Sequence, residues 1–128
     1  MEILLENLDN FVDYFYEDFF DNTPEIKKVF RNSDLLPQKI ELKNGLLFIL
    51  NSEDDRDVDE FLFKLGQRHV AYEVLEQHYP LVKVSLMNSL KFIFGDEYNS
   101  KLEEKLICLV DHICDQMQAG SKNIREAA

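Results

Sequence analysis

The chain has 128 residues with 14 basic and 25 acidic side chains, a formal net charge of −11, and 45% of its residues are hydrophobic. A chain of this size buries about two-thirds of its unfolded surface, so we expect one domain with a single core and no need for metal or disulfide staples. The negative field repels phosphate backbones and anionic lipid, which excludes nucleic acid and membrane surfaces as favoured partners.

The sequence carries no clear signal for export or membrane insertion. The longest apolar runs, such as Leu46 to Leu50, fall far short of the roughly 20 residues that span a bilayer. The opening segment, Met1 to Glu6, is acidic where a secretory signal is basic. Cys108 and Cys114 lie in one predicted helix and point to different faces, so they cannot bridge each other. We therefore expect a cytoplasmic, reduced protein, with an intermolecular disulfide as the alternative.

The composition and the first apolar pattern predict an all-α fold. Only 4 glycines and 3 prolines are present, and no stretch alternates polar and apolar residues as a half-buried strand does. A first helix that ends near Asn22 is predicted from apolar residues at spacings of three and four, namely Leu8, Phe11, Val12, Phe15 and Phe19. Thr23 then acts as a cap and Pro24 as the first residue of a short helix that runs through Phe30.

The middle of the chain predicts two longer helices around an acidic loop. A helix begins after Asn32 to Asp34, tolerates Pro37 in its first turn, and runs to about Leu50. The polar stretch from Asn51 to Asp57 is the longest loop candidate. A stripe at helical spacing follows it, made of Val58, Phe61, Leu62, Leu65, His69 and Tyr72.

The last part of the chain predicts two more helices and a tail. His78 to Pro80 restart a helix that ends at Gly95. Ser100 and Glu103 form a capping box for a last helix through Met117. We expect a single domain over residues 1–120, followed by a flexible C-terminal tail over residues 121–128.

Common catalytic signatures are absent from the sequence. It contains no glycine-rich phosphate loop, no HExxH zinc pair, no CxxC and no GxSxG elbow. The carboxylates between Glu53 and Glu60 do not have the spacing of an EF-hand, which favours a solvated charged loop. Hydrolase and nucleotide-enzyme functions therefore lose most of their support.

Three histidines remain as candidates. His69 lies in the apolar stripe, where the local pattern favours a buried histidine satisfied by a backbone carbonyl over a metal ligand. His78 is expected to cap or precede a helix, and His112 to lie on the flank of the last helix. Neither has zinc spacing with His69.

Two polar residues stand where apolar ones are expected. Tyr16 lies in an aromatic cluster, and Gln38 precedes Leu42 by one helical turn. Each has a simple explanation, because a tyrosine can keep its hydroxyl at the surface and a glutamine can face solvent in a first turn. Taken together with the imidazole of His69, they describe a pocket with one ligand on one side and two hydrogen-bond donors on the other.

Several segments resemble one family. Residues 65–74 (LGQRHVAYEV) and 78–82 (HYPLV) resemble the region around the proximal histidine of bacterial globins, and most of all single-domain bacterial haemoglobins and the globin domain of flavohaemoglobins. Residues 15–20, 24–26 and Phe30 are similar to the second helix of that family and the turn after it, and residues 34–42 to the opening of its distal helix. The resemblance runs from about Phe11 to about Met117. It implies the globin fold, a 3-over-3 helical sandwich, with a shortened N-terminal A helix.

The resemblance implies a cofactor, haem b, and a role for each site residue. His69 is implied to be the metal ligand on the proximal side, and Tyr16 and Gln38 the distal ligand-binding pair. The residues implied to contact the haem are Phe30 and Leu42, with Leu65 and Val74 on the proximal side, Tyr79 near the proximal histidine, and Arg68 within reach of a propionate.

Two departures from the family are visible. The first helix of the family is longer than the one this sequence allows before the second-helix match. In flavohaemoglobins a late glutamate joins the tyrosine near the proximal histidine, whereas an ungapped extension places Ser121 at that point. The resemblance therefore implies a weaker electron push from the imidazole toward the iron.

The leading functional hypothesis is a cytoplasmic haem-binding globin that reversibly binds oxygen, or another diatomic gas such as nitric oxide or carbon monoxide, at a penta-coordinate iron. Nitric oxide dioxygenation would need a separate reductase, because the sequence shows no flavin or nicotinamide domain. The alternative is a haem-based gas sensor or interaction module, monomer or homodimer, that uses an apolar patch on the helix from Pro80 to Phe94 or the helix from Leu102 to Met117. A helical bundle with an accidental likeness to globins is a third possibility.

Overall fold

The structure is a computed structural model that describes residues 1–29, 34–71 and 74–127, and within these residues it contains helices and no strand. The helices are α1 (Glu2–Glu6), α2 (Leu8–Asn22), α3 (Pro24–Val29), α4 (Leu36–Asn51), α5 (Asp55–Ala71), α6 (Tyr79–Phe94) and α7 (Ser100–Ala127). Single 3₁₀ turns at Glu76–His78 and Gly95–Glu97 precede α6 and α7. The all-α prediction is confirmed.

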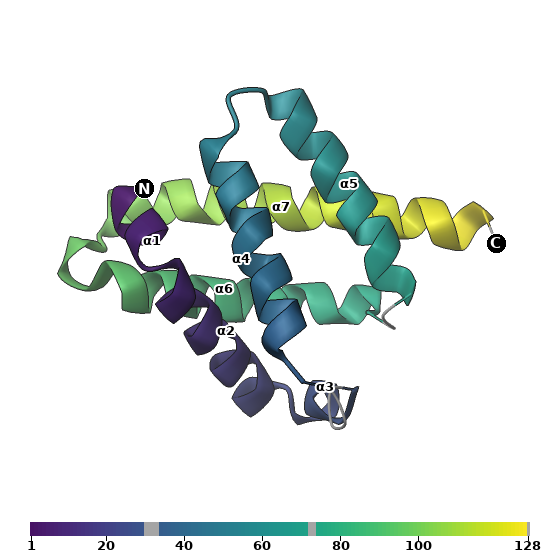
Figure 1. Cartoon of the computed structure of the whole chain (residues 1–128), viewed down its shortest axis with the longest axis horizontal. Coiled ribbons are helices and arrows are strands. Elements are labelled where there is room, and N and C mark those ends of the chain that lie inside the picture. The colour runs from purple at the N-terminus through teal and green to yellow at the C-terminus, as the bar shows by residue number, and fades with distance from the viewer. Residues whose placement is uncertain (30–33, 72–73, 128) are drawn as a thin grey trace.

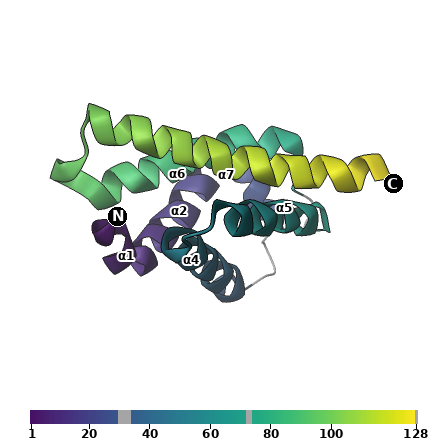
Figure 2. The same ribbon diagram turned by 90° about the horizontal axis from the view of Figure 1, so that it is seen from above.

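The helices form two layers. Helices α6 and α7 run side by side and antiparallel, and α4 and α5 cross in front of them in Figure 1. Figure 2 shows the same arrangement from above, with α6 and α7 on one side and α1, α4 and α5 on the other. Helix α2 packs on α6, α5 packs on α7, and α4 packs on α2. Ion pairs from Lys39 to Asp13 (3.0 Å) and from Lys43 to Asp9 (2.9 Å) also join α4 to α2.

The apolar stripe predicted for α2 forms a large part of the core. All five of its members are buried: Leu8, Phe11, Val12, Phe15 and Phe19. They pack against buried residues of α6 and α7, including Leu90 and Leu106. Each fully buried side chain of this size contributes about 1.5–3 kcal/mol of transfer free energy, so this one face anchors α2 to the rest of the domain.

Helices α5 and α7 approach each other closely through two glycines. A Cβ atom on Gly66 would lie 1.9 Å from the carbonyl oxygen of Met117, and a Cβ on Gly120 would lie 2.0 Å from the carbonyl oxygen of Phe63. Carbon and oxygen atoms cannot come that close, so only glycine allows the two backbones to pack in this way. This crossing sets the position of α5.

Several predicted boundaries are confirmed. Helix α2 ends at Asn22, Pro24 opens α3, and Pro37 lies in the first turn of α4. Gly95 ends α6 with a φ of 53°, a conformation that glycine adopts without strain. Cys108 is exposed and Cys114 is buried, and the two are not bonded to each other.

Other boundaries differ from the prediction. The short helix α1 lies before α2, where the resemblance implies a shortened A helix; its own apolar pattern did not predict it, and it forms because Leu4 is buried in the core. The loop expected at 51–57 is shorter, since the carboxylate of Asp54 accepts a hydrogen bond from the backbone N–H of Arg56 (2.8 Å) and starts α5 there. Helix α7 is capped by Asn99, whose Oδ1 accepts from the N–H of Leu102 (2.9 Å), and not by the expected capping box.

The chain end also differs from the expectation of a flexible tail over residues 121–128. Helix α7 continues through Ala127, and Gly120 and Ser121 are buried. The reason is the contact of this segment with α5, which the local sequence does not reveal. None of the helices in the described ranges has a stretch apolar and long enough to cross a membrane.

Candidate functional site

The site is built around the face of α5 that turns toward α4. Phe61, Leu65 and His69 are spaced four residues apart and so share one face of α5. Phe61 identifies the direction of that face, because its ring packs on Phe48 of α4 with a centroid distance of 4.8 Å. The tip of the same ring lies 3.6 Å from the place where a Cβ of Gly45 would be. His69 therefore lies on the side of α5 that faces α4, two turns beyond this contact.

His69 is held by the backbone of its own helix. Its Nδ1 hydrogen-bonds the carbonyl oxygen of Leu65 at 2.8 Å, and the side chain is half-buried. Burial lowers the pKa of His69 below its ordinary value, and the bond to Leu65 opposes this; Arg68 lowers the pKa further and Glu41 raises it. The imidazole is therefore neutral near pH 7, with its proton on Nδ1 toward the carbonyl.

Tyr16 approaches the same region from α2. Its half-buried ring packs edge-on against Phe15, with a centroid distance of 5.2 Å, and at a tilt against Phe20, with a centroid distance of 5.8 Å. Burial is the main cause that raises the pKa of Tyr16 to about 12, and the charge of Glu41 adds to it. The phenol therefore keeps its proton over the physiological range and remains a hydrogen-bond donor.

Gln38 and Leu42 occupy one face of α4, together with Gly45. Since Gly45 lies against Phe61 of α5, this face turns toward α5. Both side chains are half-buried, and Leu42 packs against the core. The Oε1 atom of Gln38 is buried and has no hydrogen-bond partner among the described residues, an arrangement that costs about 1–3 kcal/mol.

Glu41 is the residue that the sequence analysis did not identify. It lies on α4 one turn after Gln38, and its charge acts on both Tyr16 and His69. The structure thus brings side chains from α2, α4 and α5 within electrostatic range of one another. The available signal was a lone carboxylate three residues after Gln38 in an otherwise mostly aliphatic segment.

Tyr79 and Ser121 meet behind α5. The hydroxyl of Ser121 donates to the carbonyl oxygen of Gly66 at 3.0 Å, and the Tyr79 hydroxyl lies 3.0 Å from the same serine oxygen. Since the single proton of Ser121 goes to Gly66, Tyr79 is the donor in the second bond. Ser121, which the ungapped extension places at the position of the flavohaemoglobin glutamate, thus lies beside Tyr79. The Nδ1 of His69 bonds the carbonyl oxygen of Leu65.

The remaining residues of the predicted site lie around α5. Leu65 is half-buried on the face that carries His69, and Arg68 is exposed beside it. Val74 is half-buried, and its N–H donates to the carbonyl oxygen of His69 at 3.1 Å. Phe30 lies outside the described residues.

The other two histidines lie outside this cluster. The Nδ1 of His78 accepts a hydrogen bond from the N–H of Leu75 (2.9 Å) and so caps the turn before α6. His112 is exposed on α7 and bonds Asp59 at 2.6 Å. In the part of the chain that the structure describes, no group of three or more His, Cys, Asp or Glu side chains is arranged to hold a metal ion.

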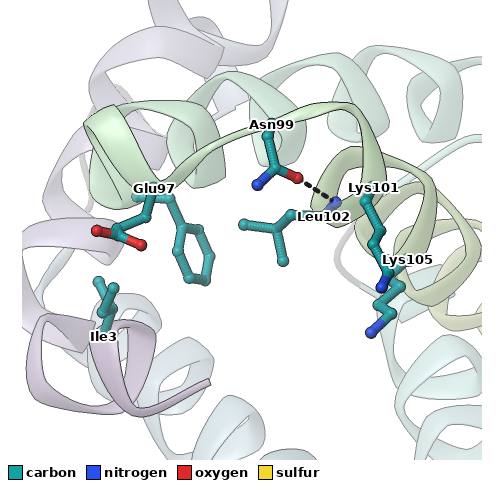
Figure 3. A pocket seen from close by; sticks show the side chains of 7 residues that line it. Ile3, Glu97, Asn99, Lys101, Leu102 and Lys105 are labelled. Carbon is teal, nitrogen blue, oxygen red and sulfur yellow. Dashed lines mark hydrogen bonds between the residues drawn. The ribbon is translucent and has the colours of Figure 1, made fainter.

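A hollow at the N-terminal end of α7 is separate from this site. It has a volume of about 330 Å³ and lies between α1 and the turn that joins α6 to α7 (Figure 3). Its lining consists of Ile3, Phe94, Glu97, Asn99, Lys101, Leu102 and Lys105. It contains no residue of the predicted site, and it opens broadly to solvent.

Comparison with known proteins identifies the family. The family model described as Globin matches residues 13–117. The Flavohemoprotein of Pseudomonas aeruginosa is 25% identical over 89 residues, and the Flavohemoprotein of Candida albicans is 29% identical over 102 residues. The alignments cover 67% and 77% of this chain but 23% and 26% of those proteins, so the chain spans about a quarter of the length of the curated relatives it matches. Because the family model matches most of its length, the chain belongs to the globin family, which implies a protein that binds haem and a gas.

Proposed function

We propose that this globin holds haem b through His69 and reversibly binds oxygen, or another diatomic gas such as nitric oxide, at a penta-coordinate iron. The observation that carries the proposal is the position of His69. Its neutral imidazole lies on the face of α5 that turns toward α4, and the charge of Glu41 on α4 acts on both His69 and Tyr16. With haem between them, one nitrogen ligand would face two hydrogen-bond donors, Tyr16 and Gln38.

The residues between α4 and α5 fit an iron porphyrin. Helix α4 is rich in apolar residues, and yet none of its residues is fully buried. An additional apolar surface beside α4 would remove more of the apolar side-chain area of this helix from water. Gln38 is half-buried on the same face of α4, and its amide carries two N–H protons that it could donate to a bound gas.

The proximal side prepares His69 as a ligand. The hydrogen bond from Nδ1–H to the carbonyl of Leu65 fixes the tautomer in which Nε2 carries the lone pair, and it limits rotation of the ring. The lowered pKa keeps the imidazole deprotonated near neutral pH, as metal ligation requires. A neutral carbonyl makes the imidazole a weaker electron donor than a carboxylate partner would.

The distal side provides the donors. Haem would supply a ferrous iron with one open coordination position, where a diatomic gas binds and, if it is oxygen, gains negative charge. Tyr16 keeps its proton because its pKa is about 12, and the amide of Gln38 carries two further donor protons. Hydrogen bonds from these groups favour a gas ligand with partial negative charge over a less polar one.

Apolar side chains would enclose the group. Leu42 would form part of the distal wall, and Leu65 and Val74 part of the proximal wall; all three are half-buried. These walls exclude water and so strengthen the donors. Arg68 is exposed beside His69 and can reach a propionate carboxylate at the solvent edge. Phe30 would pack on the porphyrin, a role that rests on the family resemblance alone.

Hemin titration of three proteins tests the proposal. The wild type and His69→Ala are compared with His112→Ala, a matched control because His112 is exposed and bonds only Asp59 among the described contacts. We expect stoichiometric hemin uptake with a strong Soret band for the wild type and the control. We expect a weaker and displaced band for His69→Ala. Identical spectra for all three proteins would exclude His69 as the iron ligand.

A separate reductase is a further part of the proposal. The two curated relatives are named as flavohemoproteins, a name that pairs a flavin with haem, and this chain matches only about a quarter of their length. Nitric oxide dioxygenation by this globin would therefore draw electrons from another protein or domain. Turnover of nitric oxide with an added reductase, lost in Tyr16→Phe, would support this activity over gas binding alone.

The surface of α6 and α7 favours a second candidate, a gas sensor that acts through a dimer. Val84 and Phe92 of α6 are 54% and 59% exposed, and Ile107 of α7 is 42% exposed. Apolar side chains at such positions are typical of association surfaces when they lie together. A change of mass in size-exclusion chromatography between the ferric and the gas-bound states would support sensing. A constant monomer would support simple gas binding.

A further inference from the structure

The last turns of α7, residues 117–125, are joined to α5 and to the segment after it by several contacts. Figure 1 shows α5 crossing α7 near the C-terminal end of the chain. Of all the helix pairs in the described residues, α5 and α7 pack most extensively. The contacts in this region lie on both sides of His69 along the chain.

The first contact is between backbones. Gly66 lies against the carbonyl of Met117, and Gly120 lies against the carbonyl of Phe63. Neither position has room for a Cβ, so the two helices cannot slide past each other without separating. Gly66 precedes His69 by three residues on α5, so the crossing fixes the position, relative to α7, of the helical turn that carries the imidazole.

The second contact is the hydroxyl of Ser121. It donates to the carbonyl oxygen of Gly66 and accepts from the hydroxyl of Tyr79, both at 3.0 Å. Ser121 belongs to α7, Gly66 to α5 and Tyr79 to α6, so one fully buried oxygen joins three helices. At a fully buried position these bonds are strong, and losing one leaves a buried group without a partner.

Two further side chains extend the contact. The Nε2 of Gln67 donates to the Oδ1 of Asn123 at 2.9 Å, and the guanidinium of Arg125 donates to the carbonyl oxygen of Val74. The N–H of Val74 in turn donates to the carbonyl of His69. The end of α7 is thus bonded to the chain immediately before and after His69.

We propose that the end of α7 holds the last turns of α5 in place, and that Ser121 is a positioning residue for His69. This inference rests on the proposed function for its relation to iron, whereas the restraint of α5 itself is independent of any cofactor. The hydroxyl of Ser121 bonds Gly66 and Tyr79, so Ser121 acts by fixing the backbone turn on which His69 stands.

The test compares Ser121→Ala with Ser89→Ala. Both serines are 0% exposed, but the hydroxyl of Ser89 bonds only the carbonyl of Ser85 in its own helix (2.6 Å). Asn123→Ala serves as a second test variant, because Asn123 is exposed and its replacement leaves the core intact. Two readouts are used: amide hydrogen exchange of residues 66–71 in the haem-free chain, and the iron–histidine stretching band of the ferrous haem-loaded chain.

We expect Ser121→Ala to exchange about 5- to 30-fold faster at these amides and to shift the iron–histidine band. Asn123→Ala should change both in the same direction by less, and Ser89→Ala should change neither. Unchanged exchange in Ser121→Ala and Asn123→Ala would overturn the proposed restraint, and an unchanged band would overturn the positioning of His69. If no variant and no wild-type protein takes up hemin, the proposed function fails, while the exchange comparison still decides whether α7 restrains α5.

Discussion

Replacing Gly66 with alanine should weaken the domain where α5 crosses α7. A Cβ at this position would lie 1.9 Å from the carbonyl oxygen of Met117, whereas real contacts of this kind are essentially never below 3.0 Å. The two backbones must therefore separate by at least about 1.1 Å, the difference between these distances. A carbonyl group in a helix cannot rotate away as a side chain does, so the strain is shared by the whole crossing.

The expected loss follows from two opposing terms. Overpacking costs about 1–3 kcal/mol and occasionally more, and a backbone clash belongs at the upper end of that range. Alanine returns about 1 kcal/mol through its higher helix propensity. We therefore expect Gly66→Ala to lower the free energy of unfolding by about 2 kcal/mol, a large share of the roughly 5–15 kcal/mol that a domain has.

Urea unfolding followed by circular dichroism measures this loss, and Gly45→Ala is the matched control. Gly45 also lies inside a helix, but a Cβ there would meet the ring of Phe61 at 3.6 Å, an ordinary contact. The control should be neutral or more stable by up to about 1 kcal/mol. If Gly66→Ala were as stable as Gly45→Ala, the close crossing of α5 and α7 would be refuted.

Three other predictions concern the site and the thiols. Tyr16→Phe removes a hydrogen-bond donor that is protonated at every physiological pH. In laser photolysis or stopped-flow experiments, the haem-loaded variant should therefore release oxygen about 10- to 100-fold faster than the wild type. Tyr14→Phe is the control, and equal rates for both variants would exclude Tyr16 from the distal side. In the haem-free chain, burial lowers the pKa of His69 in the folded state below its value in the unfolded state. As the pH falls below about 6.5, the unfolded state therefore binds the proton more readily than the folded state. The free energy of unfolding should decrease in that range. The urea midpoint of the wild type should therefore fall more between pH 8 and pH 5.5 than that of His69→Gln, and parallel pH profiles would contradict this. Burial raises the pKa of the Cys114 thiol to about 11. A thiol reagent at pH 8 should therefore modify Cys108 alone in the native protein and both cysteines in urea. Fast reaction of both cysteines in the native protein would show that α7 is not packed as described.

The fold was predictable where one helix buries one stripe of its own residues. The stripe from Leu8 to Phe19 predicts α2 because spacing of three and four is a local property of the sequence, and Pro24 and Gly95 mark boundaries by their backbone preferences alone. Helix α1 was not predictable in this way. Its five residues are too few to form a stable helix alone, and Leu4 orders them only by entering a core made by distant segments.

The site was predictable in part. His69 stands out because an imidazole interrupts an apolar stripe and because the residues around it resemble the globin family. The carboxylate three residues after Gln38 is visible in the sequence, but its effect on Tyr16 and His69 depends on three helices meeting and cannot be predicted from α4 alone. The contact of Ser121 with Gly66 depends on a crossing that two glycines allow, and a glycine followed by a serine reads locally as the end of a helix.

The absorption spectrum of the purified protein in the ferric and ferrous states is the most direct test of the central claim. It reports in one measurement whether haem is present and how its iron is coordinated. We expect a Soret band in both states, and a ferrous spectrum typical of five-coordinate iron with a histidine ligand that changes when carbon monoxide is added. A colourless protein that takes up no added hemin would contradict the account.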